Sequence, residues 1–413
     1  MAVLEQLSSK HAIELEEKHG AHNYHPLPVV LSKGEGVFVW DVEGKKYYDF
    51  LSAYSAVNQG HCHPKIISAL TEQAQKLTLT SRAFYNDVLG KYAKFITSYF
   101  GYDRVLPMNT GVEGGETAVK LARKWAYEVK KVPENQAKII FVEGNFWGRT
   151  LGAISSSTDS QSTSGFGPFM PGYKIIPYND LEALHKAVSD SNVAAFMVEP
   201  IQGEAGVNVP DEGYLKKAYE ICKQANVLFI ADEVQTGIAR TGKLICCEHE
   251  GFKPDVLILG KALSGGVFPV SAVLTSDEVM LTIKPGEHGS TFGGNPLACA
   301  VATAALEVVR DEKLSENAQE LGELFRNELG KFVETSDLVV KVRGKGLLNA
   351  IVINDTEDSS TAWDICMALK ENGLLAKPTH GNIIRFAPPL VITKEELMDC
   401  VSIIIKTLKD FEK

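Results

Sequence analysis

A single lysine follows an apolar run in the segment DVLILGKALSGG, residues 255–266. Lys261 lies between Gly260 and Ala262, so small residues and a strand predicted to be buried surround its side chain. Burying an ammonium group is costly unless the group is paired or its pKa falls. An amine with a lowered pKa attacks carbonyl carbons, so Lys261 is a candidate nucleophile. A lysine that extends into solvent is the structural alternative.

A second apolar strand ends in acidic residues. The segment VLFIADEVQTG, residues 227–237, carries Asp232 and Glu233 directly after the apolar run. In parallel α/β sheets, residues just beyond the carboxyl ends of the strands line the ligand crevice. Asp232 is therefore a candidate site residue, and an aspartate that only caps a turn is the alternative.

Two further turns follow predicted strands. In MNTGVEGGETAVKLARKWAYE, residues 108–128, the residues Thr110, Gly111 and Val112 begin an amphipathic helix, whose first N–H groups can bind phosphate. The turn matches neither G-x-x-x-x-G-K-S/T nor G-x-G-x-x-G, which excludes the usual ATP and dinucleotide motifs. In GNFWGRT, residues 144–150, Phe146 could stack on a flat ring and Arg149 could bind a carboxylate.

Together these four segments match the requirements of one cofactor, pyridoxal phosphate. It needs a lysine for covalent attachment, a carboxylate at its pyridine nitrogen, a phosphate site and a stacking ring. Asp232 would keep the ring nitrogen protonated. Lys261, once released by substrate, would move a proton as general base and acid.

The DEVQTG segment, residues 232–237, and the GKA segment, residues 260–262, have the spacing found in one family. With stretches such as FMVEPIQGEAGV and KPGEHGSTFGGNPLA, the chain resembles the class III, fold-type I aminotransferases, most nearly their ornithine-using branch, from about residue 20 onward. The resemblance implies pyridoxal phosphate held by Thr110, Gly111, Val112, Phe146, Trp147, Asp232, Gln235, Lys261, Ser290 and Thr291. It also implies a homodimer with shared active sites, because Thr291 would reach in from the other subunit.

The same resemblance implies L-ornithine and 2-oxoglutarate as substrates, bound by Tyr24, Tyr54, Arg149, Glu204 and Arg385. Tyr24 and Arg149 would position the α-amino and α-carboxylate groups of ornithine, and Tyr54 would narrow the site. Glu204 would pair with Arg385 while ornithine is bound and release it for the α-carboxylate of 2-oxoglutarate. Alternatives remain: an acetylornithine or 4-aminobutyrate aminotransferase, an aminomutase, or a non-catalytic protein of the same fold.

The pattern of apolar residues predicts the strands and helices that would position these side chains. Alternating helices and short apolar strands begin near residue 60, which predicts a mostly parallel sheet covered on both faces. The seven expected strands are Val105–Met108, Lys138–Val142, Tyr173–Pro177, Ala194–Val198, Val227–Ala231, Val256–Leu259 and Ser271–Leu274. A hairpin is expected around Glu43-Gly44, and Asn295-Pro296 should begin a helix that runs to Arg310.

The pattern therefore predicts an α/β protein with a second, smaller α+β domain, and the family resemblance implies that the fold is fold-type I. We expect residues 1–50 to contribute to the small domain, residues 51–295 to form the large cofactor-binding domain, and residues 296–413 to form a linking helix and the rest of the small domain. The Val112-Glu113-Gly114-Gly115 segment is glycine-rich where relatives often carry alanine, which would weaken the helix slightly.

Composition limits the remaining possibilities. A net charge of −10 disfavours nucleic acid as a partner. The seven cysteines have irregular spacing and suggest neither a disulfide framework nor a metal site. No membrane span or targeting segment is recognisable, so the cytoplasm is the expected location, with mitochondria as the alternative if a targeting segment has been removed.

Overall fold

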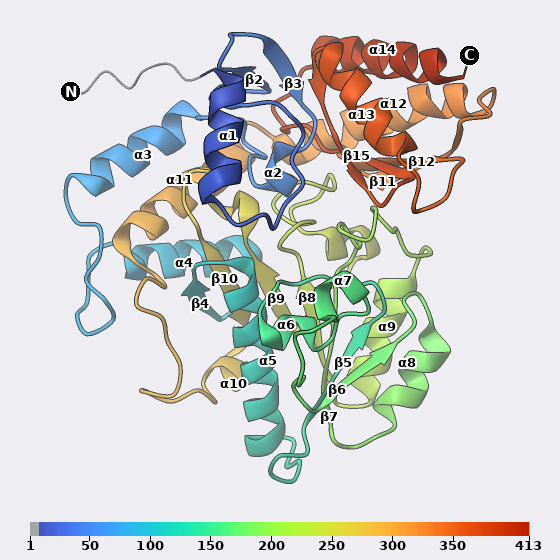
Figure 1. The fold of residues 1–413 in the computed structure, drawn as a ribbon. Coiled ribbons are helices and arrows are strands. Elements are labelled where there is room, and N and C mark those ends of the chain that lie inside the picture. Colours follow the sequence, from blue (N-terminus) through green and yellow to red (C-terminus); the bar gives the residue numbers. More distant parts are fainter. Residues whose placement is uncertain (1–7, 413) are drawn as a thin grey trace.

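The computed structural model describes residues 8–412. At its centre lies a seven-stranded sheet with the order β4-β10-β9-β8-β7-β5-β6 (Figure 1). The strands are β4 (Arg104–Met108), β5 (Lys138–Val142), β6 (Tyr173–Ile176), β7 (Val193–Val198), β8 (Leu228–Asp232), β9 (Val256–Leu259) and β10 (Ser271–Thr275). Only β10 runs antiparallel to its neighbours. The predicted seven-stranded, mostly parallel sheet is confirmed.

Both faces of this sheet are apolar because successive side chains of a strand point to opposite sides. In β5, Ile139 and Phe141 pack with helix α5 on one face, whereas Ile140 and Val142 join the larger core on the other. The helices around the sheet are α3 (Pro64–Ala74), α4 (Leu89–Phe100), α5 (Gly111–Glu128), α8 (Leu181–Val188), α9 (Tyr214–Gln224) and α11 (Pro296–Asp311). Asn295 caps α11 through a 2.8 Å hydrogen bond from Ala298 N, as its sequence predicts.

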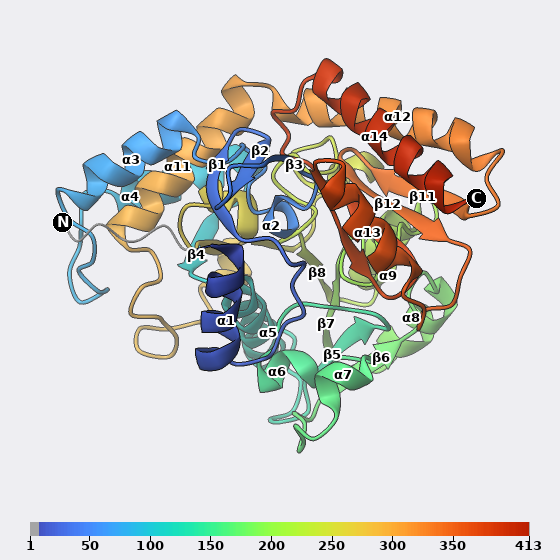
Figure 2. The same ribbon diagram turned by 45° about the horizontal axis from the view of Figure 1, so that its top comes forward.

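The C-terminal part contains a second, four-stranded sheet with the order β11-β12-β15-β14. Its elements are β11 (Val339–Lys345), β12 (Leu348–Ile353), β14 (Lys377–Thr379), β15 (Ile383–Phe386), α12 (Leu314–Val333), α13 (Thr361–Glu371) and α14 (Lys394–Phe411). Figure 2 shows α12, α13 and α14 around this sheet, beside the N-terminal strands.

The two chain ends share a third sheet. It consists of β1 (Leu31–Glu35), β2 (Phe38–Asp41), β3 (Lys46–Asp49) and the short C-terminal strand β13 (Leu374–Leu375). The turn between β2 and β3 contains Gly44 with φ 88°, so the expected hairpin is confirmed. The parallel pairing of Leu374 with Tyr48 joins segments more than three hundred positions apart.

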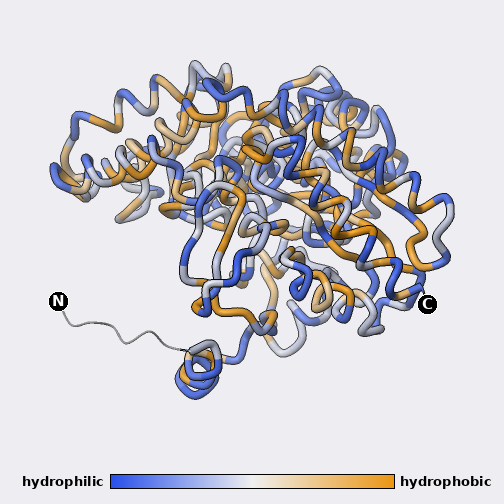
Figure 3. Tube along the Cα trace, turned by 90° about the horizontal axis from the view of Figure 1, so that it is seen from above, coloured by the Kyte–Doolittle hydropathy of each residue, from blue (hydrophilic) through white to orange (hydrophobic). Residues whose placement is uncertain are grey.

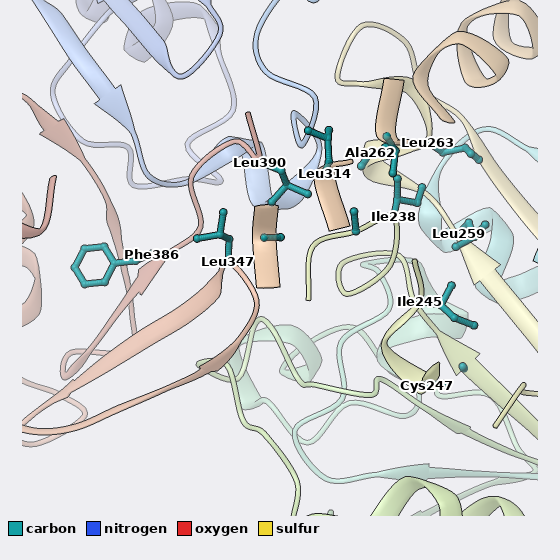
Figure 4. Close-up of a cluster of buried hydrophobic side chains, with 14 of the residues drawn as sticks. Ile238, Ile245, Cys247, Leu259, Ala262, Leu263, Leu314, Leu347, Phe386 and Leu390 are labelled. Carbon is teal, nitrogen blue, oxygen red and sulfur yellow. The ribbon is translucent and has the colours of Figure 1, made fainter. Parts of the chain in front are cut away.

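One apolar core connects the central sheet with the C-terminal elements. Figure 4 shows Leu259 of β9 and Ala262 and Leu263 beyond it in the same cluster as Leu347 and Phe386. Because Ala262 follows Lys261 and Phe386 follows Arg385, this shared core holds both predicted site residues in one framework.

Helix α1 (Ser9–His19) stands apart from the core. It has no buried residue and is largely hydrophilic in Figure 3. The remaining short helices are α2 (Ser52–Ser55), α6 (Leu151–Ile154), α7 (Ser160–Thr163), α10 (Asp277–Met280) and the 3₁₀ turns η1 (Cys246–Glu250) and η2 (Lys261–Ser264). Across residues 8–412, no helix combines the length and apolar character that crossing a bilayer requires.

Candidate active site

The carboxyl ends of strands β4, β5, β7, β8 and β9 meet at one edge of the central sheet. The segments that follow them enclose a cavity of about 230 Å³. Its wall is formed by Gly111, Val112, Phe146, Trp147, Gly148, Glu199, Asp232, Val234, Gln235 and Lys261. Half of this wall was expected from the strand pattern, because residues beyond parallel strands collect at the same edge. Trp147 and Gln235 were expected only from the family resemblance.

Lys261 lines the cavity from the second position after β9, directly after Gly260. Its backbone has φ 44°, a left-handed conformation that non-glycine residues rarely adopt. Burial lowers the pKa of the Lys261 amine, while the carboxylates of Glu204, Asp232 and Glu199 oppose this effect. An amine with a lowered pKa spends more time unprotonated and therefore nucleophilic.

Asp232 ends strand β8 on the same wall. One of its carboxylate oxygens, Oδ1, accepts a 3.1 Å hydrogen bond from the backbone N–H of Val234. Burial raises the pKa of Asp232 to about 6, although the Val234 N–H and Lys261 favour its charged form. A buried carboxylate in this position is suited to a cationic partner, which would offset the cost of its burial.

The beginning of α5 also contributes to the wall of this cavity, through Gly111 and Val112. Thr110 caps this helix in a capping box with Glu113, whose Oε2 accepts the Thr110 N–H at 2.9 Å. The N–H groups of Gly111 and Val112 have no hydrogen-bond partner within residues 8–412. A Cβ on Gly111 would lie 2.9 Å from Val234 Cγ1, so glycine keeps this helix end close to the cavity. The two free N–H groups form a site for an anion such as phosphate.

The aromatic pair after β5 takes two different positions. Phe146 lies in the cavity wall, and its N–H donates to Glu199 Oε1 at 2.8 Å. Trp147 also reaches the wall but stacks on Phe141 of the sheet, with ring centroids 5.7 Å apart. Its indole N–H donates to Ser156 Oγ at 2.8 Å.

Ser290 and Thr291 lie outside the wall of this cavity. Ser290 Oγ accepts a 2.8 Å hydrogen bond from the side chain of Asn109, next to Thr110. Thr291 is exposed. Within one chain, these two residues therefore lie near the beginning of α5 without reaching the cavity.

A chain of polar contacts extends from the cavity toward the C-terminal sheet. Gln235 Nε2 donates to Glu204 Oε1 at 3.3 Å, and the same oxygen accepts from Arg385 Nη1 at 2.8 Å. Burial raises the pKa of Glu204, but the charge and hydrogen bond of Arg385, together with Lys261 and Gln235, outweigh burial, so the net shift of the pKa is downward. The Arg385 guanidinium in turn lies over the Tyr54 ring, 4.9 Å from its centroid. Arg385 Nε is buried without a hydrogen-bond partner in the described residues.

Tyr54 owes its position to a strained turn. Residues 52–55 all have positive φ, between 46° and 73°. Asp49 Oδ1 stabilises the turn by accepting 2.9 Å hydrogen bonds from Leu51 N and Ser52 N.

The other two predicted substrate residues differ in location. Arg149 is exposed, and its guanidinium lies 5.3 Å from the centre of the Phe146 ring. Tyr24 follows α1, is 78% exposed and does not line the cavity. The structure therefore brings Lys261, Asp232, Gln235 and Phe146 together, with Glu204, Arg385, Tyr54 and Arg149 adjacent, and leaves Tyr24 at the surface.

Sequence reasoning missed Glu199. It follows β7 directly, and its two oxygens accept N–H groups from Phe146 at 2.8 Å and Gly203 at 3.4 Å. Burial, followed by the negative charge of Asp232, raises its pKa to about 8. Glu199 thereby joins the segment of Phe146 to that of Glu204. The signal that identified Asp232, an acid directly after a buried strand, applies equally to Glu199 in FMVEP.

The geometry fits pyridoxal phosphate. A cavity of this size contains an amine for the cofactor aldehyde, a carboxylate for its ring nitrogen, an aromatic ring for its face and free N–H groups for its phosphate. A Cβ on Gly203 would lie 2.1 Å from Gln235 Oε1, so glycine leaves room for Gln235 against the cavity.

Comparison with known proteins agrees with this geometry. The model of the class III aminotransferase family matches residues 19–408. The mitochondrial ornithine aminotransferase of Drosophila ananassae is 69% identical to this chain, and the match covers 95% of this chain and 90% of the relative. The mitochondrial ornithine aminotransferase of Rattus norvegicus is 64% identical, and the match covers 98% of this chain and 91% of the relative.

Two similar solved structures carry the names of two different aminotransferases. An ornithine aminotransferase from Toxoplasma gondii superposes with a TM-score of 0.97 at 53% identity, covering 98% of this chain and 95% of that one. A structure described as an acetylornithine aminotransferase from Elizabethkingia anophelis has a TM-score of 0.91 at 68% identity, covering 98% and 100%. The chain belongs to the class III aminotransferases and uses pyridoxal phosphate.

Proposed function

We propose that this enzyme transfers the δ-amino group of L-ornithine to 2-oxoglutarate, giving L-glutamate 5-semialdehyde and L-glutamate. The observation that carries the proposal is the Glu204–Arg385 pair beside Lys261. While Glu204 pairs with Arg385, the site would accept ornithine, and when Glu204 moves away, Arg385 would be free to bind a carboxylate of 2-oxoglutarate. One site can thereby accept two differently charged substrates. The names of the Drosophila and rat relatives support the same substrate.

Bound pyridoxal phosphate supplies an electron-withdrawing ring and an aldehyde carbon that exchanges the amino group. Asp232 would hold the ring nitrogen in its protonated form, and Gln235 would bind the ring hydroxyl. Phe146, with Trp147 behind it, would cover the ring. The N–H groups of Gly111 and Val112, with Thr110, would bind the phosphate.

Lys261 would have two tasks, both served by its position on the cavity wall. Its amine would attach the cofactor covalently in the resting enzyme. After substrate displaces it, the free amine would take a proton from the amine-bearing carbon of the substrate and deliver it to the cofactor carbon C4′. Burial lowers the pKa of this amine, which favours the unprotonated form that accepts the proton.

The outer residues would select which amine reacts. Arg149 would bind the α-carboxylate of ornithine and Tyr24 its α-amino group, so that the distal amine extends toward Lys261. Tyr54 would narrow the opening beside Arg385. Because Tyr24 is exposed in this chain, its part requires the segment after α1 to close over bound substrate.

The gate residue yields a direct prediction. Glu204→Ala should unmask Arg385, so that amino acids bind by their α-carboxylate and the enzyme gains α-amino transfer from glutamate-like donors by about tenfold relative to δ-transfer from ornithine, the scale expected for one charge-assisted contact. The measurement, made under single turnover, is the ratio of the product of α-amino transfer to the product of δ-amino transfer.

Glu204→Gln is the matched control, because it keeps the side-chain shape and the contact with Gln235 but removes the charge. It should shift the ratio in the same direction. An unchanged ratio for ornithine in both variants would contradict the gate.

A homodimer with shared sites is also proposed. Thr291 is exposed and lies outside its own cavity, so it is free to complete the phosphate site of a second copy. The side chains of Phe84, Tyr85 and Phe292 are 73%, 104% and 52% exposed. Gly294 lies close to Arg82, so the segments carrying these aromatic residues are neighbours. Exposed aromatic residues of this kind are typical of interfaces.

Mixing two inactive variants tests this arrangement. Lys261→Ala lacks the lysine, and Thr291→Asp would place a negative charge against the phosphate of the neighbouring site. After subunit exchange at equal amounts, about a quarter of normal activity should return, because half of the dimers are mixed and each has one intact site. Exchange without any recovery of activity would contradict shared sites.

We further propose that the chain divides near residues 50 and 295, as expected from its sequence. Lys261 then belongs to the large domain and Arg385 to the small one, and substrate binds between them. The relatives named mitochondrial favour that organelle. The cytoplasm had been expected because the sequence shows no recognisable targeting segment.

A second candidate is acetylornithine aminotransferase activity, favoured by the name of the Elizabethkingia structure. The two substrates differ at the α-nitrogen, which is a cation in ornithine and a neutral amide in acetylornithine. The decisive assay combines the purified enzyme with 2-oxoglutarate and either L-ornithine or N-acetyl-L-ornithine. Trapping the cyclic imine of glutamate 5-semialdehyde supports the proposal, and preferential use of the acetylated donor refutes it.

A further inference from the structure

We propose that Ser162, oriented by Asp159, is a positioning residue that fixes the guanidinium of Arg149 for the carboxylate of the amino donor. The inference rests on the proposed function, in which Arg149 binds that carboxylate. Neither Ser162 nor Asp159 lines the cofactor cavity, so both act through Arg149.

The contacts form a short relay. Arg149 Nη1 donates to Ser162 Oγ at 2.6 Å, and Ser162 Oγ donates to Asp159 Oδ2 at 2.6 Å. A hydroxyl has a single proton to donate. Because Asp159 takes that proton, the lone pairs of Ser162 face the guanidinium. Ser162 is only 6% exposed, whereas Arg149 is an exposed residue, so a buried hydroxyl anchors an exposed side chain.

A second restraint acts on the same guanidinium. It lies 5.3 Å from the centre of the Phe146 ring, within the range of a cation–π contact. Phe146 restrains the group from one side and Ser162 restrains its rotation. No carboxylate pairs directly with Arg149 in the described part of the chain. Its other N–H groups are therefore available for a two-point contact with a carboxylate, which requires a fixed plane.

The segment that carries Ser162 is itself held against the cavity loop. Gly144 N donates to Thr158 Oγ1 at 3.0 Å, and Asp159 Oδ1 caps α7 by accepting from Gln161 N at 2.9 Å. Figures 1 and 2 show α6 and α7 side by side near the end of β5. This short segment therefore sets the distance between Ser162 and Arg149.

The relay predicts a selective defect. If Ser162 serves carboxylate binding, its loss should matter for donors that carry a carboxylate and leave other amines unaffected. If Ser162 only stabilises the local fold, all donors should suffer alike. Three donors separate the cases: L-ornithine, 5-aminopentanoate, which lacks the α-amine, and putrescine, which lacks the carboxylate.

The test compares full-length cofactor-loaded Ser162→Ala with the original enzyme in the first half-reaction, followed by the cofactor absorbance. The half-saturating concentration should rise about tenfold for ornithine and 5-aminopentanoate, the scale of one lost hydrogen bond to a charged group. The limiting rate with these donors, and the efficiency with putrescine, should stay within about twofold, which is below that scale. Ser160→Ala, which changes an exposed hydroxyl of the same helix, should behave as the original enzyme.

Asp159→Asn tests the orienting step, because asparagine caps a helix as well as aspartate does but lacks the charge that directs the Ser162 proton. It should raise the half-saturating concentration of ornithine, and an unchanged value removes Asp159 from the relay. Equal behaviour of Ser162→Ala and Ser160→Ala, or an equal loss with putrescine, overturns the inference. Failure of the original enzyme to use ornithine would instead overturn the proposed function.

Discussion

Lys261→Ala protein is expected to retain pyridoxal phosphate noncovalently and to lose transamination by at least about two to four orders of magnitude, the contribution typical of a positioned acid–base group. The cavity keeps its phosphate-binding N–H groups, its carboxylate and its aromatic wall, so cofactor affinity should survive. The proton transfer should fail, because no other amine lines the cavity in the described residues.

Two measurements check this expectation. Cofactor content is read after dialysis, and single-turnover conversion of ornithine is followed by absorbance. Lys243→Ala is a suitable control, since Lys243 is exposed and lies outside the cavity. Added methylamine should restore part of the activity of the alanine variant by replacing the missing amine. Turnover by Lys261→Ala close to that of the original enzyme would refute the role of this lysine.

Asp232→Ala should lower the rate of the half-reaction by about two to three orders of magnitude, the effect of removing one buried electrostatic partner at a reacting centre. Without a carboxylate at the ring nitrogen, the ring is less often protonated and withdraws electrons less strongly. Cofactor binding should weaken as well, because a charge-assisted contact is lost.

A cofactor analogue separates these two effects. Pyridoxal phosphate methylated at the ring nitrogen carries a permanent positive charge, and the alanine side chain leaves space for the methyl group. The analogue should raise the rate of Asp232→Ala well above its rate with the natural cofactor, whereas it should inhibit the original enzyme by crowding Asp232. If the bound analogue leaves the variant as slow as before, Asp232 does not act through the charge of the ring.

Glu199 extends this electrostatic picture. Its burial next to Asp232 raises its pKa to about 8, so the pair carries less than two negative charges near neutral pH. A neutral Glu199 still accepts the N–H groups of Phe146 and Gly203. The cavity can therefore keep its two loops joined while Asp232 retains the charge needed at the cofactor.

The sequence was sufficient to predict the strands of the central sheet and the positions of Lys261 and Asp232 beyond them. All seven strands of the central sheet were predicted within one or two residues, because a strand covered on both faces needs a continuous apolar run. Lys261 and Asp232 follow two such runs, and parallel strands bring the residues after them to one edge. Both inferences depend only on local pattern and on a general property of parallel sheets.

The tertiary structure alone determined the contacts between distant segments. Examples are the pairing of β13 with β3, the relay from Asp159 through Ser162 to Arg149 and the left-handed turn that holds Tyr54. Gly114 and Gly115 are a further example. From the sequence, these glycines were expected only to weaken the helix. In the structure, a Cβ on Gly115 would lie 2.5 Å from the Trp147 ring, so a larger residue would not fit. These glycines allow α5 to pack closely against its neighbours, a benefit that helix propensity does not describe. Sequence periodicity reports which face of an element is buried, whereas the identity of the residue on the other side depends on how all the elements pack together.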